Sequence, residues 1–306
     1  MSIVSGAWDN AYLEPPHLNL ISANRQQLAV WDWPGEDPPL LFAHATGFHG
    51  RCWDRIIQEF PGRHSLALDS RGHGRSSKPG PPCLWRDFGR DLAAVAEHLN
   101  VRNAIGIGHS QGGHLTAQAA ALRPETYRAL LLVDPTIFPF DYYGAAPPDA
   151  SFTLRRRAVW SSPGEMFERF RSRGPFTRWQ PGILRDYCDY GLLPNGSTLG
   201  DSQGYVLACP PPIEASIYLN SNAPESNIYP EIATIGQPVV VMRAGAVRTP
   251  GVFDLAASPT AIDLASKFTR GRDMVLPESS HYIPMERPDA VIAEIRRLLQ
   301  ELLLVE

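Results

Sequence analysis

Short apolar runs recur along the chain, and longer segments whose apolar positions step by three and four lie between many of them. A short apolar run between turn residues is typical of a buried strand, whereas the longer step indicates a helix with one buried face. The clearest helical pattern spans residues 83–99, with apolar residues at Trp85, Phe88, Leu92, Val95 and Leu99. Strands that alternate with helices predict a mostly parallel sheet covered on both faces.

The pattern predicts seven strands and five helices. The strands are expected at residues 27–33, 39–44, 65–69, 103–105, 129–133, 238–242 and 273–276. The helices are expected at residues 51–60, 83–99, 113–122, 259–268 and about 291–302, with Pro288 in the first turn of the last helix. Residues 1–15 are expected to form a loosely structured leader.

The alternation stops between about residues 136 and 236. This segment has short helical patches, no convincing parallel strand and eight Arg residues from Arg155 to Arg185. Its aromatic residues include Tyr142, Tyr143, Trp160, Phe167, Phe170, Phe176, Trp179, Tyr187 and Tyr190. We interpret residues 136–236 as a mostly helical cap inserted into a core formed by residues 1–135 and 237–306. The run Arg155 to Arg157 is expected to be a solvated face, with an anion site as the alternative.

Composition narrows the class of protein. With 306 residues, 43% hydrophobic and 20% charged, the chain has the composition of a soluble globular protein. The net charge of -4 shows no excess of basic residues of the kind that binds nucleic acid. No apolar run is long enough to span a membrane. The first 20 residues lack the basic head and apolar run of a signal peptide, so we expect a cytoplasmic protein.

The thiols and imidazoles do not predict a metal site. Cys52, Cys83, Cys188 and Cys209 are scattered and form no C-x-x-C pair. The histidine pairs His44 with His49 and His109 with His114 lack a third ligand at suitable spacing. We therefore expect no metal and no other cofactor. His44 and His73 are expected to brace loops by hydrogen bonds.

The strongest chemical motif is Gly106-Ile107-Gly108-His109-Ser110-Gln111-Gly112-Gly113. It contains Gly-x-Ser-x-Gly between a predicted strand and a predicted helix, which is the context of a nucleophile elbow. Gly108 and Gly112 are expected because a side chain at either place would collide with the neighbouring strand or helix. Ser110 would stand at a helix N-terminus, which favours developing negative charge. The alternative is an ordinary serine helix cap.

Three further blocks occur in order with this motif. They are His44-Ala45-Thr46-Gly47, the stretch Asp69-Ser70-Arg71-Gly72-His73-Gly74-Arg75-Ser76, and Ser280-His281 before Glu286-Arg287-Pro288. In these blocks the chain resembles the α/β-hydrolase superfamily, in the subgroup of serine hydrolases with a helical cap. The resemblance covers residues 27–135 and 237–304, and the cap is placed by position alone.

The resemblance implies a triad in the order Ser, acid, His. Ser110 would be the nucleophile and His281 the base, held in its tautomer by an acid. Many relatives carry the acid after the strand that corresponds to 239–242, but residues 243–250 contain none. Asp134 is the best replacement and Asp254 the second. Asp134, which precedes Pro135, could instead simply shape a turn.

The resemblance also implies an oxyanion hole and a substrate pocket. The backbone amides of Gln111 and Thr46 would supply the two donors, and the Thr46 hydroxyl could add a third. His109, Phe48, Trp160, Phe167 and Trp179 are candidates for substrate contact, although the cap aromatics could equally form the cap's own core.

The predicted activity is cofactor-independent hydrolysis of a carboxylic ester through an acyl-enzyme, acting on a small molecule. Serine at the elbow argues against the dehalogenases and epoxide hydrolases of the superfamily, which carry Asp there. Lactonase, amidase and carbon–carbon hydrolase activities remain open, as does a non-catalytic ligand receptor on the same fold. Nothing in the sequence predicts an oligomeric state.

Overall fold

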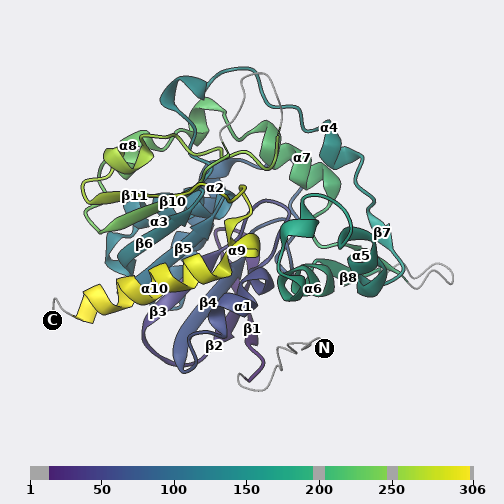
Figure 1. Cartoon of the computed structure of the whole chain (residues 1–306), viewed down its shortest axis with the longest axis horizontal. Coiled ribbons are helices and arrows are strands. Elements are labelled where there is room, and N and C mark those ends of the chain that lie inside the picture. Colours follow the sequence, from purple (N-terminus) through teal and green to yellow (C-terminus); the bar gives the residue numbers. More distant parts are fainter. Residues whose placement is uncertain (1–13, 196–203, 247–253, 304–306) are drawn as a thin grey trace, which may run out of the picture.

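The computed structural model describes residues 14–195, 204–246 and 254–303 (Figure 1). The predicted leader, residues 1–15, lies almost entirely outside these ranges. Part of the acid-free loop after residue 242 also lies outside them.

An eight-stranded sheet forms the centre of the structure, in the order β1-β2-β4-β3-β5-β6-β10-β11. The strands are β1 (His17–Ala23), β2 (Gln26–Trp33), β3 (Glu36–Ala43), β4 (Arg63–Asp69), β5 (Ala104–His109), β6 (Tyr127–Val133), β10 (Val239–Ala244) and β11 (Gly271–Leu276). β2 is antiparallel to β1 and β4, and the other neighbouring pairs are parallel. The predicted mostly parallel sheet is confirmed, and each of the seven predicted strands overlaps an observed one.

Helices cover both faces of the sheet. The helices of the core are α1 (Asp54–Ile57), α2 (Trp85–His98), α3 (Gln111–Leu122), α8 (Tyr229–Ile232), α9 (Ile283–Glu286) and α10 (Pro288–Leu303). α1 and α10 pack on one face in a cluster that contains Phe42, whereas α2, α3 and α8 pack on the other in a cluster that contains Leu41. These neighbours on β3 point to opposite faces because side chains alternate along a strand. Both are fully buried, as the continuous apolar runs predict.

Residues 151–195 and 205–219 lie to the right of the central sheet in Figure 1, whereas α8 lies at the left. The elements of the 136–236 segment are α4 (Ser151–Leu154), β7 (Val159–Trp160), α5 (Pro163–Phe170), α6 (Pro181–Tyr190), β8 (Leu192–Pro194), β9 (Tyr205–Leu207) and α7 (Pro211–Leu219), followed by α8. The three strands form an antiparallel sheet that the sequence pattern does not reveal. The segment's end returns to the core, because Ile228, Ile232 and Ile235 pack in the same cluster as α2 and α3. The division into core and cap stays a prediction.

Short 3-10 turns complete the described structure. They are η1 (Gly50–Trp53), η2 (Pro124–Thr126), η3 (Phe140–Tyr142), η4 (Phe176–Arg178), η5 (Pro224–Ser226) and η6 (Leu264–Lys267). The helix predicted at 259–268 is wrong, since only η6 forms there. The start of that stretch is held by other bonds: Thr260 donates through its hydroxyl to the Pro135 carbonyl, and the Ala261 N–H donates to the Ile137 carbonyl. The N–H groups of Leu264, Ser266 and Phe268 then bond carbonyls three residues earlier, so the stretch forms 3-10 turns instead of an α-helix.

Buried histidines make the stability of this fold depend on pH, and His114 on α3 is the clearest case. Its Nε2 lies 2.8 Å from the Ser226 carbonyl, which only accepts, so Nε2 carries the proton. Burial lowers the pKa of His114 to about 4. An unfolded histidine titrates near pH 6.5. The stability that depends on neutral His114 is therefore present above about pH 6.5 and is lost as the pH falls toward 4.

We expect the free energy of unfolding to fall as the pH is lowered from about 6.5 to 4. His114→Gln keeps a donor for Ser226 but does not titrate, so its free energy of unfolding should fall by up to about 3 kcal/mol less over this range. Urea unfolding of both proteins at several pH values measures the difference. Equal pH dependence in the two proteins would show that His114 is not buried as a neutral imidazole.

Candidate functional site

Ser110 stands in a strained turn between β5 and α3. Its φ is 57° and its ψ is -119°, a conformation that costs a non-glycine residue about 1–3 kcal/mol. Two glycines let the strand and the helix approach closely enough to hold it. A Cβ on Gly108 would lie 2.2 Å from the Gly112 carbonyl oxygen, and one on Gly112 would lie 2.1 Å from the Ala43 carbonyl oxygen. The steric reason predicted for both glycines is confirmed.

Ser110, His281 and Asp134 form a continuous chain of hydrogen bonds. The Ser110 Oγ lies 2.9 Å from His281 Nε2, and His281 Nδ1 lies 2.6 Å from Asp134 Oδ2. The three residues follow β5, β11 and β6, respectively, and these strands are parallel. Their carboxyl ends therefore meet at one edge of the sheet, which brings together residues up to 171 positions apart.

The Asp134 carboxylate is completely buried and accepts every hydrogen bond that it makes. Its Oδ1 accepts from the Ala244 N–H at 3.0 Å, the Ser258 hydroxyl at 2.6 Å and the Thr260 hydroxyl at 3.2 Å. These donors stabilise the ionised form, which would otherwise be costly to bury. The sequence analysis did not identify Ser258 or Thr260, because their partner lies more than 120 residues away.

Asp254, the other candidate acid, lies elsewhere. It is exposed, it lines the pocket described below, and its Oδ1 accepts the Ala256 N–H at 2.8 Å. Both ring nitrogens of His281 already bond Ser110 and Asp134. The geometry therefore favours Asp134 as the partner of the imidazole.

The directions of the hydrogen bonds around Ser110 follow from proton counting. Since an ionised Asp134 only accepts, His281 Nδ1 carries the proton and Nε2 accepts from the Ser110 hydroxyl. The single Ser110 proton is then used, so the Thr136 hydroxyl, 3.1 Å away, must donate to Ser110 Oγ. The sequence analysis missed Thr136. The available signal was its place two residues after Asp134, at the same strand end.

The loop after β3 is held by the two bracing histidines. His73 Nε2 accepts the Gly47 N–H at 3.0 Å, and His44 Nε2 accepts the Ser70 N–H at 3.0 Å. Burial lowers the pKa of both imidazoles, which keeps them neutral and keeps these nitrogens able to accept. The bracing role predicted for His44 and His73 is confirmed.

Thr46, in that loop, is linked to Gln111, the first residue of α3. The Thr46 hydroxyl donates to Gln111 Oε1 at 3.1 Å, so it is not a free side-chain donor as the sequence analysis suggested. Within the described ranges, no acceptor bonds the backbone N–H of either residue. Gln111 also stands in the first turn of α3, where an N–H has no helical partner. Both amides are therefore available to an anion.

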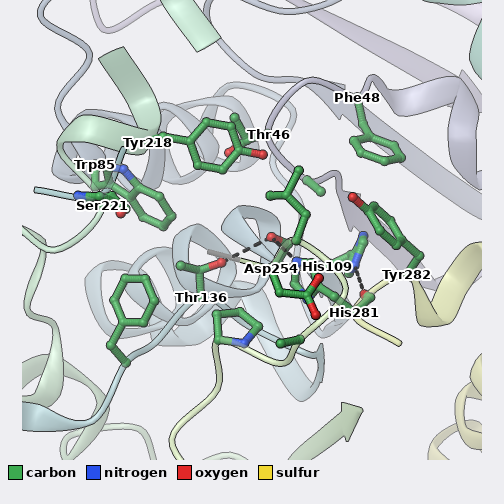
Figure 2. Close-up of a pocket in the computed structure, with 17 residues that line it drawn as sticks. Thr46, Phe48, Trp85, His109, Thr136, Tyr218, Ser221, Asp254, His281 and Tyr282 are labelled. Carbon is green, nitrogen blue, oxygen red and sulfur yellow. Dashed lines mark hydrogen bonds between the residues drawn. The ribbon is translucent and has the colours of Figure 1, made fainter. Parts of the chain in front are cut away.

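Ser110 lines a pocket, which Figure 2 shows in close-up. Its empty space, counted together with the open solvent at its mouth, is about 650 Å³. It is lined by Ala45, Thr46, Phe48, Trp85, His109, Ser110, Thr136, Phe138, Pro148, Tyr218, Ser221, Asp254, Leu255, Ala257, Pro259, His281 and Tyr282. In Figure 2, Phe48 and Tyr282 lie on one side of the pocket, and Trp85, Tyr218 and Ser221 lie on the other. The lining is mostly apolar and aromatic.

The structure separates the five predicted substrate contacts into two groups. His109 and Phe48 line the pocket, but Trp160, Phe167 and Trp179 do not. Trp160 and Trp179 are buried in a cluster with other aromatics of the 136–236 segment, and the Arg185 guanidinium covers the Phe167 ring at 3.9 Å. None of the three lines the pocket, but their cluster includes Phe48 and Tyr282 of the pocket wall, and Trp179 contacts both of these rings.

Four aromatic residues that the sequence analysis missed line the pocket instead: Trp85, Phe138, Tyr218 and Tyr282. The position of Tyr282, next to His281, is the one signal that the sequence offered.

In the run Arg155 to Arg157, the first and last residues are exposed, as the predicted solvated face requires, and only Arg156 is partly buried. Arg156 pairs with the buried Glu214 and donates to the Tyr187 hydroxyl at 3.0 Å. A Cβ on Gly47 would lie 2.9 Å from Glu214 Oε1, so this ion pair packs directly against the loop that carries Thr46. Arg157 pairs with Glu165 at the surface.

No group of three His, Cys, Asp or Glu side chains in the described part of the chain is arranged to hold a metal ion. The ring nitrogens of His49, His109 and His114 instead bond the carbonyls of Tyr187, His281 and Ser226. Of the helices in the described residues, none combines the length and apolarity needed to cross a membrane.

The model of the alpha/beta hydrolase family matches residues 40–294. The chain belongs to this family. A type I acyl-CoA thioesterase, mpaH of Penicillium roqueforti, is 28% identical over 176 residues, which are 51% of this chain and 40% of the relative. The chain thus spans about two fifths of that relative's length. The lipase LipV of Mycobacterium tuberculosis is 25% identical over 268 residues, 87% of this chain and 95% of the relative.

Solved structures share the fold. The crystal structure of E-2-(acetamidomethylene)succinate hydrolase superimposes with a TM-score of 0.73 at 20% identity, covering 93% of this chain and 99% of the other. The relatives therefore support a hydrolase and do not select one substrate.

Proposed function

We propose that the chain is a serine hydrolase that cleaves carboxylic esters through an acyl-enzyme, without a cofactor. One observation carries the proposal: the Ser110 hydroxyl donates to His281, which is held by the buried Asp134, and this hydroxyl opens into an apolar pocket. A serine hydroxyl needs such a base to become nucleophilic. A lipase and a thioesterase among the relatives support acyl transfer as the reaction class.

In the proposed first step, Ser110 Oγ attacks the ester carbonyl carbon and its proton passes to His281 Nε2. The Asp134 carboxylate stabilises the resulting imidazolium. The carbonyl oxygen becomes an oxyanion, which the backbone N–H groups of Gln111 and Thr46 bind. When the carbon–oxygen bond to the alcohol breaks, His281 returns the proton to the leaving alkoxide.

In the second step, water attacks the acyl-enzyme and His281 takes a proton from it. Collapse of the tetrahedral intermediate releases the carboxylic acid, and His281 returns the proton to Ser110 Oγ. The aromatic lining favours esters with apolar acyl or aryl groups, because it removes apolar substrate surface from water. Thioesters, lactones and carbon–carbon bonds next to a carbonyl offer the same electrophile, so a substrate panel decides among them.

Ser110→Ala removes only the nucleophilic oxygen, so the fold should be retained. We expect kcat for p-nitrophenyl butyrate to fall by several powers of ten, because the residues of a triad act as a unit. Steady-state hydrolysis by the purified variant, with circular dichroism as the folding check, tests this expectation. Activity within a factor of ten of the parent would exclude Ser110 as the nucleophile. A parent that binds esters without turnover would favour the receptor alternative.

The choice of acid is tested by a matched pair of variants. Asp134→Asn keeps the shape but presents the wrong partner to His281 Nδ1, so kcat should fall by roughly four powers of ten. Asp254→Asn changes an exposed carboxylate that does not touch the imidazole, so kcat should stay within a few fold. Measuring kcat for both variants on one ester decides between the acids. The opposite ranking would move the acid to Asp254.

The hydroxyl of Thr136 should matter because it donates to the attacking oxygen. Thr136→Val is nearly isosteric and removes this donor, so kcat/KM should fall by about 10- to 100-fold. Thr136→Ser keeps the donor and should recover most of the loss. The measurement is kcat/KM of the three proteins, with the rate of inactivation by a serine-directed organophosphonate as a second readout. Equal rates for the Val and Ser variants would assign Thr136 to packing alone.

A further inference from the structure

Arg178, in η4 of the 136–236 segment, reaches the loop that carries His281. One of its guanidinium nitrogens, Nη2, lies 2.9 Å from Glu286 Oε2 and 2.6 Å from the Glu278 carbonyl oxygen. A second link joins the same two segments, since the Gln180 N–H donates to the Met285 carbonyl at 2.8 Å. This part of the segment is therefore fastened to both ends of the loop between β11 and α10.

Glu286 connects Arg178 to the residue before His281. Its Oε2 accepts the Ser280 N–H at 3.0 Å, and its Oε1 accepts the Ser280 hydroxyl at 2.5 Å. The Glu286 side chain is only 4% exposed, whereas that of Arg178 is 53% exposed. The Ser280 N–H, the Ser280 hydroxyl and Arg178 all donate to this carboxylate, so both of its oxygens have partners although the side chain is buried. Arg178 is the cation that compensates the buried charge.

We propose that Arg178 and Glu286 are positioning residues for His281. Through this pair, the packing of η4 against the His281 loop sets the position and the charge environment of the base. The inference rests on the proposed function in taking His281 as the general base. Neither residue lines the pocket, so both act through Ser280 rather than on substrate. Loss of either residue should lower kcat and leave KM little changed.

Because the Arg178–Glu286 network is charged, replacing either residue should shift the pH dependence of activity in a defined direction. Within the described residues, the titratable groups near the His281 ring are Asp134 at the end of β6, His109 at the end of β5, the neighbouring Tyr282, and Asp254, which lines the same pocket. None of these changes when Arg178 or Glu286 is replaced. A negative charge near an imidazole favours its protonated form, and a nearby positive charge disfavours it.

The experiment compares the pH dependence of kcat/KM for p-nitrophenyl butyrate in matched variants. Arg178→Met leaves the Glu286 charge uncompensated. The acidic limb of the kcat/KM pH profile should therefore move to higher pH by roughly 0.3 to 0.7 units. Glu286→Gln removes the negative charge, so the limb should move to lower pH. Arg178→Lys keeps the charge and should return the limb toward the parent position. A merely structural role would lower activity without moving the limb in opposite directions.

Arg185→Met is the control, because it removes an exposed Arg of the same segment that pairs with Asp189 at 4.0 Å and does not touch the loop. It should change neither kcat nor the limb. Should Glu286→Gln fail to fold, the Met and Lys variants of Arg178 decide alone. An NMR titration of the His281 ring gives the same comparison without turnover, so a failure of the proposed esterase activity is distinguished from a failure of this inference. Unchanged limbs, or shifts in one direction, would overturn the proposal.

Discussion

The Asp134 carboxylate is the group on which the arrangement of the site depends. A fully buried carboxylate is costly unless donors replace the water that it loses. Here the donors come from the end of β10, from the loop at 258–260 and from His281, which lie far apart in the sequence. Satisfying one charge therefore joins three segments at the edge of the sheet.

The same edge of the sheet holds Ser110 in its strained turn and Thr46 in its braced loop. The strain at Ser110 persists because Gly108 and Gly112 let β5, α3 and β3 pack closely, and any added side chain would separate them. His73 holds the Gly47 N–H and stays neutral because it is buried. The triad is thus built from positions fixed by the core. The 136–236 segment adds Thr136 beside Ser110, part of the pocket lining, the Arg156–Glu214 pair against the Thr46 loop, and the contact of Arg178.

The parallel sheet follows from the strand pattern, whereas Ser110 was predicted from the elbow motif, and His281 and Asp134 from the family resemblance together with the order of the strands. Once residues 104–109 and 127–133 are strands of a parallel sheet, Ser110 and Asp134 must meet at one edge. The failed predictions concern features that depend on packing in three dimensions. The sequence pattern around Trp160 and Trp179 is the same whether these residues contact a substrate or pack in a buried cluster. Only the fold shows that they pack in a cluster. The helix predicted at 259–268 did not form: the Thr260 hydroxyl bonds Asp134 and the Pro135 carbonyl, and the backbone that follows makes only a 3-10 turn.

The central claim is that Ser110 forms a covalent acyl-enzyme, and the most direct test is to trap it. The protein is incubated with a fluorophosphonate, and its mass and tryptic peptides are then measured. The account predicts one adduct per chain, located on Ser110, whose formation is slowed by several powers of ten when His281 is replaced by Gln. An adduct on another residue, or none under conditions that label a control serine esterase, would contradict it.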